Sequence, residues 1–313
     1  LVSDVEQAYY VTNLNQEITG QAPDGRQLYA DGGVSDRFRD VFVLRNTKLG
    51  KAKNLLVRLS RPNDGPGLHG SIQYVYGTSE DVHPLHSNRA VSNWQARAGF
   101  SFNDPEKATS NYEVEHRILA MVGYTLHWNR YLEVSPRFQT TATLVYDGRE
   151  GRPYSYVFAN DLNGDGERSN DLLYVPESRD DATVSYADGF DVDAFFEFLG
   201  GTGLAEYAGG PAPRNSHHAS WVHRWDLRIV QRFPVWDPLH AEVFLDLMNV
   251  GNLIDDDWGR VEEVGFPYRA DVLRADIVDG RYRYSGFDPD HPEVRAGIRQ
   301  SRWGIQVGAK VQF

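Results

Sequence analysis

One segment of the sequence has the side chains and the spacing of a calcium-binding loop. It follows the pattern D-x-N-x-D-G between Asp161 and Gly166. Oxygen atoms at alternate positions can converge on a hard cation, and glycine permits the sharp turn that such a loop requires. The carboxylates on this segment would also repel one another less with a divalent cation between them. The predicted calcium ligands are Asp161, Asn163, Asp165, Glu167 and Asp171.

The calcium loop departs from the full EF-hand pattern at its far end. The twelfth position, normally a bidentate acid, is Leu172, one place after Asp171. The alternative interpretation is a turn in which the same side chains bind their own backbone. Apart from this possible calcium ion, we expect no cofactor.

Histidine pairs and catalytic motifs give weaker indications. His217 and His218, with His223 nearby, and the pair His83 and His86 carry imidazoles that could bind a transition metal. Neighbouring histidines in a loop point in different directions more often than they chelate. No Ser, His and Asp combination has a motif context for nucleophilic catalysis. We therefore expect that the protein is not an enzyme.

Composition limits the class of protein. The chain has 313 residues, no cysteine, a net charge of −12 and 12% aromatic residues. Disulfides and thiolate metal sites are thus excluded, and an acidic chain is not expected to bind nucleic acid. No apolar run approaches the roughly 18 residues of a transmembrane helix. The chain opens at Leu1 without a signal sequence, and we expect it to be an internal piece of a longer protein.

The last residues alternate strictly in polarity, which indicates a β-strand with two different faces. One face is apolar and comprises Trp303, Ile305, Val307, Ala309, Val311 and Phe313. The other face has no apolar side chain and comprises Arg302, Gly304, Gln306, Gly308, Lys310 and Gln312. A terminal strand that ends on an aromatic residue is typical of outer-membrane barrels.

Seven further segments alternate in the same way. The expected strands are residues 4–13, 52–60, 67–77, 115–126, 130–146, 221–233, 239–249 and 301–313. Their polar faces carry charges that the core of a β-sandwich could not hold unpaired, whereas the wet lumen of a barrel can. We predict that Ile305, Val307, Leu245 and Leu227 face lipid, and that the lumen side holds Gln306, Arg228, Asp246 and Arg137.

The connections between these strands alternate short and long. Short turns are expected at residues 61–66, 127–129 and 234–238, and long structureless loops at 14–50, 79–113, 147–220 and 250–300. Asp191 to Leu199 is a candidate for a short loop helix. Tight turns on one side and large loops on the other are typical of outer-membrane barrels. The fold class predicted is therefore an all-β, antiparallel transmembrane β-barrel with long extracellular loops.

Several motifs, in a characteristic order, resemble a known family. They include Tyr9 to Asn15, Arg152 to Phe158, Asp161 to Gly166, Asn170 to Pro176 and Asp246 to Asn252. Together they resemble the C-terminal part of Oar-like TonB-dependent receptors. The resemblance implies that residues 1–313 are about eight C-terminal strands of a larger, probably 22-stranded, barrel whose plug domain is absent here.

The resemblance also implies partners and a location. A receptor of this family lies in the bacterial outer membrane, contacts its lipid, and is inserted by the barrel-assembly machinery. It works with the TonB system and its own plug domain to import a ligand, which this sequence does not identify. Two alternatives remain: a surface adhesion protein whose barrel is an anchor, or a free-standing eight-stranded outer-membrane barrel.

Overall fold

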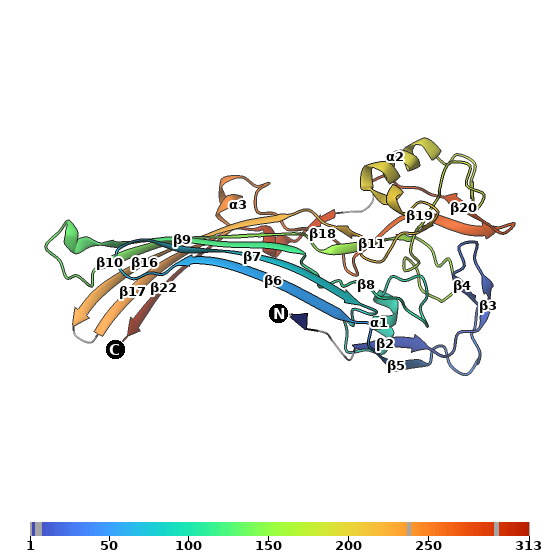
Figure 1. Cartoon of the computed structure of the whole chain (residues 1–313), viewed down its shortest axis with the longest axis horizontal. Coiled ribbons are helices and arrows are strands. Elements are labelled where there is room, and N and C mark those ends of the chain that lie inside the picture. Colours follow the sequence, from blue (N-terminus) through green and yellow to red (C-terminus); the bar gives the residue numbers. More distant parts are fainter. Residues whose placement is uncertain (1, 4–7, 237–238, 291–293, 313) are drawn as a thin grey trace.

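The computed structural model describes residues 2–3, 8–236, 239–290 and 294–312, and its main element is a large antiparallel sheet (Figure 1). Strands make up 47% of the chain and helices 11%, so the protein is mostly β. The strands of this sheet run in the order β1 (Val2–Ser3), β6 (Lys51–Arg61), β7 (Gly67–Asp81), β9 (His116–His127), β10 (Gln139–Arg149), β16 (Val222–Trp236), β17 (Leu239–Met248) and β22 (Gly304–Gln312). A ninth strand, β8 (Ala108–Thr109), pairs with the end of β7.

The large sheet is open within the described part of the chain. Its path runs from β1 at one end to β22 at the other, and the two end strands are not paired with each other. Neighbouring strands pair over nearly their whole lengths, as between β10 and β16, where Gln139 lies opposite Arg232 and Arg149 opposite Val222. The all-β class is therefore shown, as an open sheet rather than a closed barrel.

Two of the expected strands differ from the structure: one begins later than expected, and the other pairs outside the large sheet. The segment 130–146 becomes a strand only from Gln139, because Ser135 to Phe138 form a β-turn closed by the Phe138 N–H on the Ser135 carbonyl, at 2.9 Å. Proline favours the second position of such a turn, and Pro136 occupies it. A 3-10 helix, η1 (Trp128–Arg130), precedes this turn, so the connection is longer than the expected 127–129.

The segment 4–13 also differs from expectation. Residues 4–7 lie outside the described residues, and β2 (Ala8–Asn13) pairs with β5 (Phe42–Thr47) in a separate two-stranded sheet. The place beside β6 is taken by β1. Of the expected turn at 234–238, residues 234–236 instead extend β16, and residues 237–238 lie outside the described residues.

The long connections were expected to be structureless, and this expectation is wrong. They fold into a lobe beyond one end of the sheet (Figure 1). Its five-stranded sheet has the order β13 (Val184–Tyr186), β20 (Arg281–Ser285), β19 (Arg269–Val278), β11 (Pro153–Phe158) and β15 (His217–His218). Its core contains fully buried aromatic and aliphatic side chains, among them Phe158, Leu173, Phe195, Tyr282 and Tyr284. Segments from different connections complete this core, so none of them is an independent loop.

The predicted loop helix is confirmed as α2 (Val192–Thr202). The Asp191 carboxylate accepts a hydrogen bond from the Ala194 N–H and so caps its first turn. Gly203, with φ 83°, ends it in the left-handed conformation that glycine adopts without strain.

The remaining elements are short. They are β3 (Ile18–Gln21), β4 (Gln27–Tyr29), α1 (Ala90–Ala96), β12 (Tyr174–Val175), η2 (Leu204–Tyr207), β14 (Gly210–Pro211), α3 (Val250–Ile254), β18 (Glu262–Val264), β21 (Val294–Ala296) and α4 (Ile298–Ser301). In the described residues, no helix is both long enough and apolar enough to span a membrane.

Candidate functional site

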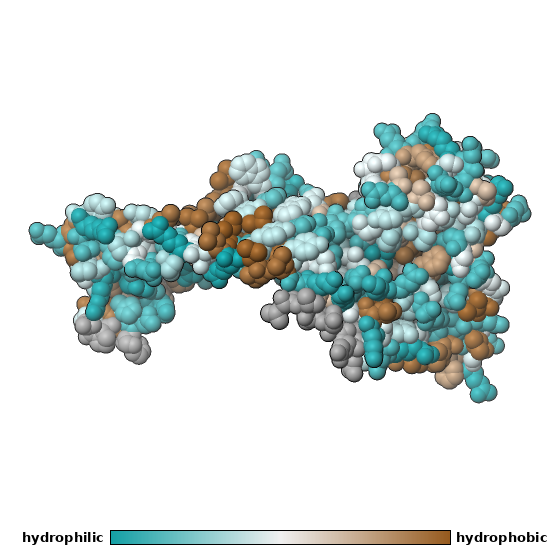
Figure 2. Space-filling view, in the orientation of Figure 1, coloured by the Kyte–Doolittle hydropathy of each residue, from teal (hydrophilic) through white to brown (hydrophobic). Residues whose placement is uncertain are grey.

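One face of the large sheet is apolar and exposed. Leu59 is 74% exposed and Val307 69%, although both are aliphatic. Leu245 lies opposite both Ile229 and Val307, and residues directly opposite one another project to the same face. The exposed large apolar side chains of these strands include Leu55, Val57, Leu59, Leu68, Ile72, Val122, Leu144, Val243, Ile305, Val307 and Val311. Brown surface lies over part of the sheet in the face that Figure 2 shows.

The opposite face of the same strands carries charges in pairs. Arg228 lies opposite Asp246, which lies opposite Gln306, and the Arg228 guanidinium is 3.4 Å from the Asp246 carboxylate. Two further cross-strand ion pairs follow on this face: Arg232 with Glu242 at 2.5 Å and Arg117 with Asp147 at 2.8 Å.

The predicted separation into two faces is confirmed for seven of the eight residues named for it. Leu227 and Ile305 both lie in the row of Leu247, on the apolar face with Leu245 and Val307. The exception is Arg137, which lies in the turn before β10 and not on the sheet, because Pro136 delays the start of that strand.

A band of stacked aromatic rings crosses the apolar face at the end near the lobe. His116 stacks on Tyr74 and on Trp221, with ring centroids 6.1 Å and 6.4 Å apart. Trp221 stacks on His223, whose Nδ1 lies 2.7 Å from the Tyr146 hydroxyl. Tyr76 and Trp225 extend the band at its two ends. We call these seven residues the lobe-side aromatic band.

A second group of aromatic rings lies at the turn end of the sheet. Phe138 contacts both Trp128 and Phe233, with centroid distances of 6.5 Å and 5.6 Å. A strand rises about 3.3 Å per residue, so the stretch of β16 from His223 to Phe233 spans about 33 Å. A strand tilt of about 40° reduces this to about 25 Å, the height of the apolar band of outer-membrane barrels.

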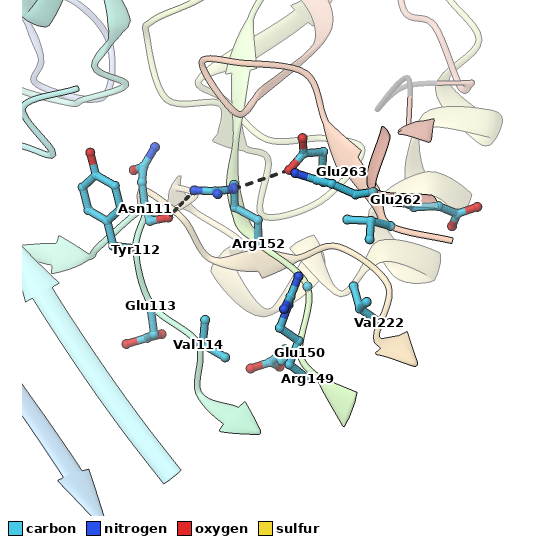
Figure 3. Close-up of a pocket in the computed structure, with 13 residues that line it drawn as sticks. Asn111, Tyr112, Glu113, Val114, Arg149, Glu150, Arg152, Val222, Glu262 and Glu263 are labelled. Carbon is cyan, nitrogen blue, oxygen red and sulfur yellow. Dashed lines mark hydrogen bonds and ion pairs between the residues drawn. The ribbon is translucent and has the colours of Figure 1, made fainter. Parts of the chain in front are cut away.

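A polar pocket of about 180 Å³ lies where β10 and β16 enter the lobe (Figure 3). Arg152 crosses it, donating to the Asn111 carbonyl at 3.2 Å and lying 3.5 Å from the Glu263 carboxylate. Three more acids line the pocket: Glu113, Glu150 and Glu262. With charges of both signs and this small volume, the pocket can hold a small polar group.

His218 lies beside this pocket between two acids. Its Nε2 is 3.8 Å from Glu113 and its Nδ1 is 3.9 Å from Glu150. The side-chain interaction with Glu113, together with the charge of Glu150, raises the pKa of His218 against the effect of its burial. Each ring nitrogen therefore faces a different carboxylate at ion-pair distance, an arrangement that favours the protonated imidazole.

The loop predicted to bind calcium holds itself together through its backbone. The Asp161 carboxylate accepts hydrogen bonds from the N–H groups of Gly164 and Gly166, at 2.8 and 2.9 Å. Asn163 Oδ1 accepts from the Asp165 N–H, and Asp165 Oδ1 from the Glu167 N–H, each at 2.9 Å. This is the geometry of the alternative interpretation, an Asx-rich turn.

The other two predicted ligands, Asp171 and Glu167, bind other partners. Asp171 is fully buried; its Oδ2 accepts from the N–H groups of Leu162 and Asn163, and its Oδ1 lies 3.5 Å from Arg26. The Glu167 side chain instead accepts from the Gln95 amide at 2.8 Å. Among the residues that the structure describes, no three His, Cys, Asp or Glu form a group that could hold a metal ion. Calcium binding by this loop stays a prediction.

Burial shifts the protonation of these acids. It raises the pKa of Asp171 to about 6, although the Arg26 charge acts in the opposite direction. Burial, together with the charges of Asp171 and Asp161, raises the pKa of Asp165 well above its usual value. The Asn170 amide donates to Asp165 Oδ2 at 2.9 Å, while its own buried Oδ1 has no hydrogen-bond partner.

The remaining histidines do not converge. His217 Nε2 lies 2.9 Å from the Thr202 carbonyl, whereas His223 belongs to the lobe-side aromatic band. His86 lies between Tyr112 and Asn111. His83 is buried, and burial with the charges of Arg97 and Arg214 lowers its pKa to about 2. The members of each pair thus lie in different surroundings.

The chain was compared with protein-family models, with curated proteins and with solved structures, and none of them matches it.

Proposed function

We propose that this chain is part of the wall of a bacterial outer-membrane β-barrel, with the apolar face of its large sheet against lipid. The observation that carries the proposal is that face itself, which is exposed, apolar and bounded by aromatic rings at both ends. Tyrosine and tryptophan favour the membrane–water interface because their rings are apolar at one end and polar at the other. In water, an apolar surface of this extent would cause aggregation.

The opposite face supports the same assignment. It carries ion pairs such as Arg228 with Asp246 and Arg117 with Asp147. These charges require water, and in a large barrel the face opposite the lipid borders a wet lumen. A soluble β-sandwich would bury one face of each sheet in a protein core, and neither face of this sheet has such a cover among the described residues.

The barrel is proposed to belong to a TonB-dependent receptor that captures and imports a ligand. The motifs from Tyr9 to Asn252 support this family, and the lobe supplies a folded extracellular structure at one end of the sheet. The open edges at β1 and β22 are consistent with a wall that continues into further strands. In the complete protein, a plug domain and a TonB box would precede Leu1 in the gene, and a signal peptide encoded directly before Leu1 would contradict the receptor assignment.

Spin labels on adjacent residues of β22 test the barrel assignment. The 313 residues contain no cysteine, so Val307→Cys and Gln306→Cys each introduce one labelling site in this chain, and any cysteine elsewhere in the complete protein is replaced by serine. In outer-membrane vesicles that contain the complete protein, we expect the label at 307 to be relaxed mainly by oxygen, which concentrates in lipid. The label at 306 should be relaxed mainly by a water-soluble nickel chelate. Equal access of the nickel chelate to both labels would overturn the proposal.

A further inference from the structure

A cavity of about 350 Å³ lies between the end of β7 and the lobe, and two buried arginines line it. Arg97 is 2% exposed and Arg214 is 6% exposed. They come from distant parts of the chain: Arg97 follows α1, and Arg214 follows β14. The fold therefore brings two positive charges to one enclosed space, which is costly unless something compensates for them.

The described residues compensate for Arg214 only in part. Its Nη2 lies 2.8 Å from the Asp81 carboxylate and also donates to the Asp81 carbonyl and, at 3.4 Å, to the Ala108 carbonyl. Its Nη1 is buried and has no hydrogen-bond partner. One guanidinium donor group is thus left unused beside the cavity.

Arg97 is compensated even less. Its Nη2 donates to the Phe102 carbonyl, and its guanidinium lies 5.0 Å from the Phe102 ring and 5.8 Å from the Trp94 ring. Its Nε and Nη1 are buried without a hydrogen-bond partner, and no described carboxylate forms an ion pair with it. Burial and the charge of Arg214 lower the pKa of Arg97 to about 9, so it remains charged at neutral pH.

The other walls of the cavity are mainly apolar. They include Val82, Ala98, Phe100, Leu172, Pro211 and Ala212. Lys107 and Glu106 are exposed at its border, and Lys107 is paired with Glu80 at 2.9 Å. A guanidinium binds the two oxygens of a carboxylate through parallel hydrogen bonds. A phosphate would bring charged oxygens against the apolar walls, whereas a carboxylate with an apolar body matches both parts of the lining.

We propose that this cavity is a binding site for a small carboxylate with an apolar body, whose carboxyl group is held by Arg97 and Arg214. Both arginines line the cavity and carry donors that no described group uses, so a small reorientation of either guanidinium would supply the hydrogen bonds, while the apolar walls contact the remainder of the molecule. This assignment does not depend on the large sheet lying in a membrane.

The test uses benzoate and benzamide, which have the same shape and differ in charge, with the complete chain in detergent micelles. Isothermal titration calorimetry should show benzoate binding at least tenfold tighter than benzamide. Arg97→Met should weaken benzoate binding at least tenfold. The matched control is Arg89→Met, which removes an exposed arginine from the same segment and should leave the affinity within about twofold.

A second variant keeps the test decisive if Arg97→Met does not fold. Ala108→Phe adds a large side chain at a residue of the cavity wall and removes neither arginine. It should abolish benzoate binding. Absence of benzoate binding to the unmodified chain, equal affinity for benzamide, or unchanged binding by Ala108→Phe would each overturn the proposal.

Discussion

Arg26 is a buried arginine of the lobe that combines ion pairs, a hydrogen bond and ring contacts in one side chain. Its guanidinium contacts Asp24 at 2.6 Å, Asp171 at 3.5 Å and the Leu172 carbonyl at 2.7 Å. It also lies over the rings of Phe100, Phe158 and Tyr282. No sequence pattern marks this arginine, because its partner Asp171 is far along the chain. A lone arginine in a polar segment ordinarily indicates a solvated side chain.

Replacing Arg26 by methionine should destabilise the lobe by about 3–5 kcal/mol, because Asp171 would remain buried without its cation. The measurement is the free energy of unfolding of the lobe, from hydrogen exchange of its core amides in the complete chain. Arg179→Met is the matched control: the Arg179–Asp193 pair is exposed, and its loss should cost about 1 kcal/mol or less. Equal effects of the two substitutions would contradict the role given to Arg26.

Asp165→Asn should make the lobe more stable at pH 8 and leave it unchanged at pH 4. The folded pKa of Asp165 is raised above the unfolded value of 3.8, so this group favours folding only at low pH. That contribution is lost as pH rises through the raised pKa, and asparagine avoids the loss. In the variant, a flip of the Asn170 side-chain amide also lets the NH₂ group introduced by Asp165→Asn donate to Asn170 Oδ1, which has no hydrogen-bond partner among the described residues of the unmodified chain.

The same experiment separates the turn from the calcium interpretation. Asp188→Asn, at an exposed lobe residue, is the control and should have no effect at either pH. If the loop binds calcium, the ion should stabilise the unmodified chain at pH 8 but not the Asp165→Asn variant. If the loop is a self-contained turn, calcium and chelator should give equal stabilities. A variant less stable than the unmodified chain at pH 8 in chelator would refute the electrostatic argument.

At the scale of elements, the strands of the large sheet were predictable and the lobe was not. A strand whose two faces meet different surroundings alternates between apolar and polar residues. In β22 this alternation runs from Ile305 to Val311 without an exception. The lobe strand β11 is instead buried on both faces, with all six of its residues buried. Such strands lose the alternation that reveals a strand. Their pairing, for example β11 with β19, joins segments distant in sequence.

The apolar and polar faces of β22 should respond differently to the same charge. In lipid vesicles, Val307→Arg should reduce the free energy of unfolding of the complete protein by about 2–4 kcal/mol, the cost of an arginine near the middle of a bilayer. Gln306→Arg is the matched control on the next residue and should cost about 1 kcal/mol or less, because its side chain lies with Arg228 and Asp246. Urea titration of both variants measures the difference, and equal costs would contradict the assignment of the faces.

At the scale of the whole molecule, the lobe buries its apolar side chains, whereas the sheet exposes them. The lobe encloses its apolar side chains in one core, with Phe195, Leu173 and Tyr284 fully buried. The sheet exposes its apolar side chains along one face and keeps ion pairs on the other. Sequence patterns predicted the second arrangement from alternation alone. They could not predict the first, which depends on contacts among several long connections and on buried arginines that have no periodic signal.

This contrast predicts how the isolated chain behaves in solution. Without lipid or detergent, the exposed apolar face and the open edges at β1 and β22 should drive association, since unpaired edge strands are templates for pairing with other chains. We expect sedimentation velocity in plain buffer to show large aggregates, and detergent micelles to disperse them. The lobe should keep its protected core amides in both conditions, because its apolar side chains are buried against one another and not exposed. A monodisperse, cooperatively unfolding monomer in plain buffer would show that the apolar face is stable in water, and the membrane assignment would then be wrong.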